Sequence, residues 1–324
     1  MPSATILPPA SFASQQGTVG QAYVFAEEAI RQELTERLNV LAMGLVMGVG
    51  DLQGRGSDVI RVTRFGGIGF DEQMTAMADE TAMIPTTGHT LGHDTVTIAR
   101  YGLAKEETYQ SQILGRAEAL GLEDMVIRAP NSWLATLRAN VATEVSTFAS
   151  GVGTSGAAWT YDDELELVAA FHETEGFNAD MGVVSMRHPE QYTDLRNSVR
   201  NEPGLQNDAS LQMLLQGLGQ GQDPSAFPFL RIMNHSSFDV VTSSGDHVGG
   251  AYVPGAVAWV VANTLPITVD NPTMATFVPE FGIVIERKST GEVGTAKFVM
   301  NAFFGTDKLD PSLFPQFKIT SVND

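Results

Sequence analysis

Three glycines in the stretch RFGGIGFDEQ, residues 64–73, form the first pattern in this chain that could do chemistry. A glycine-rich loop that leads into a helix can hold a phosphate with its backbone N–H groups. The spacing here fits neither GxGxxG nor GxxxxGK followed by Ser or Thr, and Asp71 and Glu72 would put negative charge where the phosphate binds. The sequence therefore predicts no phosphate-containing cofactor here, and we interpret the stretch as the tip of a projecting segment.

Two histidines four residues apart, His89 and His93, form the second candidate, because on a helix this spacing puts both imidazoles on one face for a metal. The surrounding GHTLGHD contains two glycines and no apolar periodicity, so a helix is not expected, and the glutamate of an HExxH motif is missing. Asp94 is the nearest further ligand. We expect no metal site, and a soluble metalloenzyme using this histidine pair is the least favoured reading.

Acidic residues at 162–166 (DDELE) could in principle supply a general acid and base. They stand at a predicted helix start, where the helix dipole favours carboxylates, so capping and solubility explain them more simply.

Many serines are present, but the sequence contains no GxSxG nucleophile elbow, so a hydrolase is not supported. Trp133, Trp159 and Trp259 lie in apolar patterns typical of a core rather than a ligand cage. We predict no catalytic residue, no cofactor and no enzymatic activity.

The composition is that of an acidic globular chain. It has 324 residues, 43% of them hydrophobic, which is enough for about two domains. Asp and Glu number 38 against 19 Lys and Arg, so the net charge of −19 would repel the phosphates of DNA. No apolar run reaches the length of about 18 residues that a membrane helix needs, and no secretion signal is recognisable. The absence of cysteine excludes disulfides and thiolate sites. We expect an intracellular protein without a membrane partner.

The first half of the chain predicts an arm, a helix and a projection. About twenty residues rich in Pro, Ser and Gln form an extended arm. Apolar residues then repeat at helical spacing from Ala22 to about Met47. Two β-branched runs, at 59–65 and 94–100, enclose about 28 residues without a clear element, which indicates a two-stranded projection with a long tip. An isolated hairpin is only marginally stable, so we expect the projection to rest on another surface, most naturally a neighbouring copy.

The second half mixes helices and strands. Helical spacing from Leu134 to Phe148 predicts a long helix that Gly151 ends, with Pro130 in its first turn or at a kink. Further helices are expected at 160–176, 189–201 and 209–221. Strands are expected at 181–186, 238–243, 256–263, 276–289, 295–305 and 317–321.

The order of these elements resembles that of the major capsid proteins of tailed bacteriophages with the HK97 fold. VIRVTRFGGIGFDEQ leading to DTVTIARYGLAKEETY is similar to the extended loop of that family, and the helix at 122–149 is similar to its spine helix. GVVSMRHPEQYTDLR is similar to the start of the axial domain. GAYVPGAVAWVVAN and EFGIVIERKSTGEVGTAKFVMNAFFG resemble the end of the axial domain and the peripheral sheet.

The resemblance implies an α+β fold class. The expected HK97-type capsid fold has an N-terminal arm, an extended two-stranded loop, a long spine helix, a peripheral β-sheet domain and an α/β axial domain. The implied parts are an N-terminal arm and helix at 1–47, the extended loop at 48–104, the peripheral domain with the spine helix at 105–157, the axial domain at 158–270 and the peripheral return strands at 271–324.

The resemblance also implies a structural function. Copies of the chain would assemble into pentamers and hexamers of an icosahedral shell around double-stranded DNA, without sequence-specific binding. The expected location is the virion capsid, assembled in the host cytoplasm. Expected partners are the chain itself, a separate scaffolding protein, a portal and a decoration protein; no large N-terminal scaffolding segment is expected, because the fold starts within about twenty residues. The alternative is an encapsulin-type nanocompartment shell, which shares the fold.

One departure from the family concerns covalent cross-linking. Some members join a lysine of the extended loop to an asparagine of a neighbour, but the first lysine of this chain is Lys105, after the loop has returned. Arginine stays protonated and cannot replace that nucleophile, so we expect no such cross-link. We expect the charged residues of the loop to contact an adjacent subunit instead. These residues are Arg55, Arg61, Arg64, Asp71 and Glu72.

Overall fold

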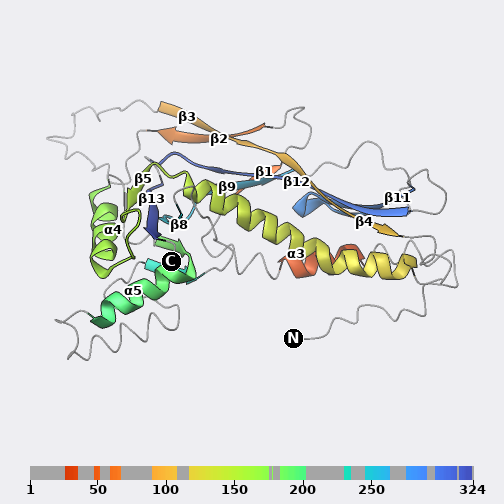
Figure 1. Ribbon diagram of the computed structural model, residues 1–324. Coiled ribbons are helices and arrows are strands. Elements are labelled where there is room, and N and C mark those ends of the chain that lie inside the picture. The colour runs from red at the N-terminus through yellow and green to blue at the C-terminus, as the bar shows by residue number, and fades with distance from the viewer. Residues whose placement is uncertain are drawn as a thin grey trace, which may run out of the picture.

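The computed structural model describes residues 26–35, 47–51, 59–66, 90–107, 117–174, 177, 183–201, 230–234, 245–262, 275–289, 296–311 and 314–322. Figure 1 shows one long helix lying across a six-stranded sheet, with a smaller sheet and two shorter helices at one end and a two-stranded ribbon beyond the large sheet. In the described part of the chain, no helix is long and apolar enough to cross a membrane.

The six-stranded sheet is organised around its longest strand, β12 (Ala296–Lys308). β12 pairs antiparallel with β11 (Ile283–Ser289), β4 (Ala99–Glu107) and, at its carboxyl end, β9 (Val257–Val261). β10 (Ala275–Val278) extends the sheet beyond β11, and β1 (Met47–Asp51) extends it beyond β9 in parallel. A 3-10 turn, η3 (Pro279–Phe281), joins β10 to β11. Three neighbours meet along one strand, so β12 sets the geometry of the whole sheet.

The long helix α3 (Ala117–Ser146) packs on this sheet through one apolar face. At its centre Trp133, 1% exposed, makes tilted or edge contacts with the rings of Trp259, Phe281 and Phe304, at centroid distances between 5.1 and 5.8 Å. Its indole N–H also donates to the backbone oxygen of Phe281 at 3.1 Å. Truncating a buried tryptophan of this kind typically costs about 3–5 kcal/mol of stability. The helical segment 26–35 joins the same core through Ala26, Ile30 and Leu34.

The predictions for these helices hold with one correction. The long helix is confirmed, and of the two positions left open for Pro130 the structure shows the one inside the helix, where proline removes one backbone donor. The N-terminal helix does not reach Met47, because Met47 begins strand β1 and pairs with Ala258. The rest of its predicted span, 22–25 and 36–46, lies outside the described residues.

The smaller sheet contains five strands in the order β5 (Ser150–Val152), β13 (Gln316–Val322), β8 (Asp246–Tyr252), β6 (Val183–Arg187) and β7 (Leu230–Asn234). Helices α4 (Tyr161–Glu173) and α5 (Pro189–Asn201) lie beside it (Figure 1). The predicted helices at 160–176 and 189–201 and the predicted strand at 181–186 are confirmed. The helix expected at 209–221 and the strand expected at 238–243 fall outside the described residues.

Strand β8 was missed in the sequence because two glycines interrupt its β pattern. The structure shows that packing requires them. A Cβ on Gly250 would lie 2.3 Å from Cγ1 of Val145 on α3, and one on Gly249 would lie 2.4 Å from the backbone oxygen of Met186 on β6. These glycines let the end of α3 and the neighbouring strand approach β8 closely.

A buried ion pair joins α4 to the smaller sheet. Glu164 and Arg187 are 1% and 0% exposed; Nη2 of Arg187 donates to Oε1 of Glu164 at 2.8 Å, and Nη1 lies 2.7 Å from Oε2. The indole of Trp159 donates to the same carboxylate at 2.9 Å, and the guanidinium lies 5.2 Å from the Trp159 ring centroid. The sequence interpretation of Glu164 as a capping or solubilising acid is therefore wrong. That role belongs to Asp163, which forms a capping box with Thr160.

We predict that Glu164→Ala lowers the free energy of unfolding by about 3–5 kcal/mol, because it leaves the Arg187 guanidinium buried without its counter-charge. Urea denaturation followed by circular dichroism measures the change. The matched control is Glu166→Ala on the exposed side of α4, expected within about 0.5 kcal/mol of the wild type. Equal stability of the two variants would contradict the role assigned to this ion pair.

Candidate assembly site

The projection predicted from the two β-branched runs is an antiparallel ribbon. β2 (Val59–Gly66) pairs with β3 (Thr90–Thr97) from Val59 opposite Thr97 to Gly66 opposite Thr90. The second run, predicted as one strand at 94–100, is two strands, because the chain changes partner at Ile98 and β4 pairs with β12. Figure 1 shows β3 and β4 as one continuous band that passes from the ribbon into the large sheet.

The base of the ribbon packs on the chain's own body. Ile60 and Val96 face each other across the ribbon, are 3% and 0% exposed, and share an apolar cluster with Ala258, Val260 and Leu309. On β9, Ala258 and Val260 alternate with Val257 and Val261, which belong to the core under α3. Since successive residues of a strand face opposite sides of a sheet, α3 and the ribbon cover opposite faces of β9. The projection was expected to rest on another surface, most naturally a neighbouring copy; at its base, that surface is the chain's own sheet.

The ribbon lies against the large sheet where the backbone of β12 closely approaches the end of β3. Gly305 of β12 lies against the end of β3, where an added Cβ would come within 2.0 Å of the backbone oxygen of Thr97. The backbone N–H of Asp310 donates to the carboxylate of Asp94 on β3 at 3.3 Å. The absence of a side chain at Gly305 therefore allows β3 to cross β12 at this point.

The outer face of the ribbon is mostly polar where its side chains are described, near the base. Arg61, His93, Thr95 and Thr97 are exposed, on the side opposite the buried pair Ile60 and Val96. An exposed polar face on an anchored ribbon is a surface that a second protein chain can cover through charged and hydrogen-bonded contacts.

The predicted contact residues are only partly described. Arg61 lies on β2 opposite Thr95, and Arg64 lies three residues further along the same strand, opposite Gly92. Arg55, Asp71 and Glu72 lie outside the described residues, as does His89. Their contact with an adjacent subunit stays a prediction. Lys105 is exposed on β4 opposite Phe298, so it belongs to the large sheet rather than to the ribbon.

Ile60 and Val96, which anchor the ribbon, were not among the functional residues predicted from the sequence. Each belongs to a β-branched run in which apolar residues alternate with others, and this period of two indicates that one face of the strand is buried. The alternation does not say what covers that face, because strand β9, on which the ribbon packs, is about 160 to 200 residues away in sequence.

Three acids lie near the ribbon base. Partial burial raises the pKa of Asp307 on β12, and the like charge of Asp94 on β3 raises it further, against the lowering effect of Lys308. Partial burial likewise raises the pKa of Glu144 on α3, and Asp307 adds to that shift. Lys308 donates to the backbone oxygen of Thr147, the residue directly after α3, at 2.6 Å.

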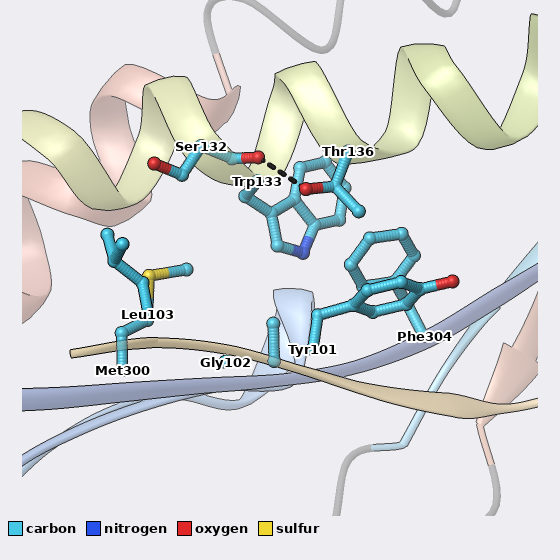
Figure 2. A pocket seen from close by; sticks show the side chains of 9 residues that line it. Tyr101, Gly102, Leu103, Ser132, Trp133, Thr136, Met300 and Phe304 are labelled. Atoms are coloured by element: carbon cyan, nitrogen blue, oxygen red, sulfur yellow. Dashed lines mark hydrogen bonds between the residues drawn. The ribbon is translucent and has the colours of Figure 1, made fainter.

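The cleft between α3 and the sheet has a mostly apolar lining. Figure 2 shows Ser132, Trp133 and Thr136 of α3 above Tyr101 and Leu103 of β4 and Met300 and Phe304 of β12. The hydroxyl of Tyr101 accepts a hydrogen bond from Asn140 at 2.7 Å, and its ring stacks on Phe304. This lining supports packing between helix and sheet rather than acid–base chemistry.

Comparison with known proteins gives matches of fold. No protein-family model and no curated protein matches this sequence. The capsid structure of the cyanophage P-SCSP1u has a TM-score of 0.53 and 10% identity, covering 88% of each chain. The capsid of cyanophage Pam1 has a TM-score of 0.52 and 11% identity over 86% of this chain and 89% of that one. The capsid of the Myoviridae phage XM1 has a TM-score of 0.51 and 9% identity over 86% of this chain and 90% of that one. The chain therefore has the α+β, HK97-type fold of tailed-phage capsid proteins.

We predict that Asp307→Asn weakens the pH dependence of stability. A carboxyl whose pKa is higher in the folded chain binds its proton more tightly there, so its contribution to stability falls as pH rises from about 4 towards neutrality. The variant should be more stable than the wild type at pH 7, by less than about 1 kcal/mol because these groups are partly solvated. Urea denaturation at several pH values measures this, with the exposed Asp162→Asn as control. A variant that is less stable than the wild type at pH 7 would contradict the assignment.

Proposed function

We propose that this chain is a major capsid protein that assembles with copies of itself into pentamers and hexamers of an icosahedral shell around double-stranded DNA. The observation that carries the proposal is the fold, shared over 86–88% of the chain with solved phage capsids. In such a shell the chain is a structural subunit rather than an enzyme. Its location is the virion capsid, assembled in the host cytoplasm.

The ribbon supports this proposal physically. Its base is held on the chain's own sheet by Ile60 and Val96, while the described part of its other face is mostly polar and exposed. An anchored ribbon can lie over the next subunit with a defined direction, so less conformational entropy is lost on assembly than with a free loop. In a closed ring each subunit offers the same surface, so modest contacts are repeated around the ring.

The charge of the chain supports a wall that encloses DNA without binding it tightly. A net charge of −19 opposes association with phosphates. We propose that scaffolding, portal and decoration functions belong to separate proteins. We also propose that the shell is held without lysine–asparagine cross-links, since Lys105 lies on β4 in the large sheet.

We expect the full-length chain, expressed alone or with its scaffolding protein, to form closed shells visible by negative-stain microscopy. Boiled and reduced shells should run as one band near 34.7 kDa on a denaturing gel. Small oligomers under every condition would contradict the capsid function, and a covalent ladder would contradict the absence of cross-links. Shells that contain host enzymes instead of DNA in infected cells would indicate a nanocompartment.

We predict that Arg61→Glu combined with Arg64→Glu lowers shell yield at least about tenfold, because like charges replace attractive contacts to acids of an adjacent subunit. Yield is measured by light scattering and particle counts, and circular dichroism checks the fold of the subunit. The matched control reverses two exposed arginines of α5, Arg196 and Arg200. Normal yield from the ribbon variant would rule out this role.

A further inference from the structure

Two histidines and a glutamate meet where the smaller sheet adjoins helix α5. His188 directly follows β6, Glu190 lies in the first turn of α5, and His247 is the second residue of β8. One ligand atom from each of the three side chains lies within 4.8 Å of the others. This cluster is separate from the ribbon, and no pattern in the sequence pointed to it.

The cluster has a buried and an open side. His247 is 3% exposed, the side chain of His188 is 12% exposed, and that of Glu190 is 48% exposed. The Oε2 atom of Glu190 lies 2.5 Å from Nε2 of His247 and 3.9 Å from Nδ1 of His188. The two imidazole rings stack with their centroids 3.6 Å apart and their planes at 15°. An ion from solvent can therefore reach the three donors past the glutamate.

A buried glutamine holds the two histidine backbones together. Gln191 is 0% exposed; its side-chain oxygen accepts from the N–H of His188 and its amide donates to the backbone oxygen of His247, both at 3.1 Å. An added Cβ at Gly249 would lie 2.9 Å from the same glutamine oxygen, so the glutamine is tightly enclosed. The two histidines are thus positioned by a fixed support, as metal-binding side chains usually are.

Hydrogen bonding within the fold does not fully explain the buried histidine. Nδ1 of His247 has no hydrogen-bond partner among the residues that the structure describes, and the ring's polar contact is with Glu190, a half-exposed side chain. The atom that His247 offers to an ion is therefore Nε2, which faces Glu190, while Nδ1 can carry the ring proton.

We propose that His188, Glu190 and His247 bind a divalent transition metal of the zinc class. Two imidazoles and one carboxylate form a donor set typical of zinc, with a fourth position for water, whereas calcium and magnesium prefer oxygen donors alone. Ligand atoms in a tetrahedral zinc site are about 3.3 Å apart. The observed 2.5 and 3.9 Å from Oε2 of Glu190 bracket this value. To bring the donors onto one ion, the His188 ring must tilt out of the stack, and its Nδ1 must give up the hydrogen bond that it accepts from the backbone N–H of Glu190 at 3.3 Å.

The proposed metal joins segments far apart in the chain. It connects the junction of β6 and α5 to β8, about 57 residues later. The chain contains no cysteine, so disulfides cannot make such a link. Metal bound only by the folded state raises stability with metal concentration. The sequence predicted no metal site, and the site proposed here depends on this tertiary contact between distant segments.

The test uses the full-length chain, freed of metal with a chelator, and zinc or cobalt ions as probes. We expect one equivalent of zinc per chain by calorimetry, a higher melting temperature with zinc, and affinity lowered at least about tenfold in His188→Gln and in Glu190→Gln. The control is His172→Gln, which changes an exposed histidine of α4 and should bind zinc as the wild type does. X-ray absorption at the zinc edge of the wild type should show two imidazole ligands, a readout that does not depend on the folding of any variant.

Two results would overturn the proposal. One is a wild-type chain that binds no zinc at micromolar concentration. The other is zinc binding that both cluster variants retain unchanged, which would place the metal elsewhere, for example at His89 and His93. Neither result depends on whether the chain forms a shell, so failure of the metal site and failure of the capsid function are distinguishable.

Discussion

Burial of one face of α3 against the sheet around β12 is the interaction on which the rest of the structure depends. The indole of Trp133 contacts the rings of Trp259 on β9, Phe281 in η3 and Phe304 on β12, so one side chain holds three segments in place. The carboxyl end of the same helix reaches β8, where Gly250 allows contact with Val145. The 30-residue helix therefore contacts both sheets and fixes their relative orientation.

The opposite face of the same sheet positions the ribbon. Alternation along β9 presents Val257 and Val261 to the helix and Ala258 and Val260 to the ribbon, so the two contacts are coupled through one strand. Gly305 then lets β3 cross β12 and continue into the sheet as β4. The helix–sheet packing and the placement of the ribbon therefore share strand β9, so the surface proposed for assembly is built directly on the core.

Charge has two different roles in this chain. Between α4 and the smaller sheet, Glu164 and Arg187 neutralise each other, and the Trp159 indole donates to the Glu164 carboxylate, so the fold depends on their pairing. At the ribbon base, Asp307 and Glu144 are partly buried like charges, and their raised pKa values indicate that the folded chain holds them at a cost. The acidic excess of the whole chain, in contrast, acts at long range and opposes binding to nucleic acid.

The sequence by itself determined the local elements. Leucine and valine spacing predicted the long helix, Pro189 marked the start of α5, and β-branched runs predicted the ribbon, because helix and strand periodicity are properties of neighbouring residues. Tertiary structure alone decided that Glu164 is buried, that β8 needs its glycines, that Ile60 packs on β9, and that His188 meets His247. Each of these depends on a contact between segments distant in the chain, and no local pattern of residues records which segments meet.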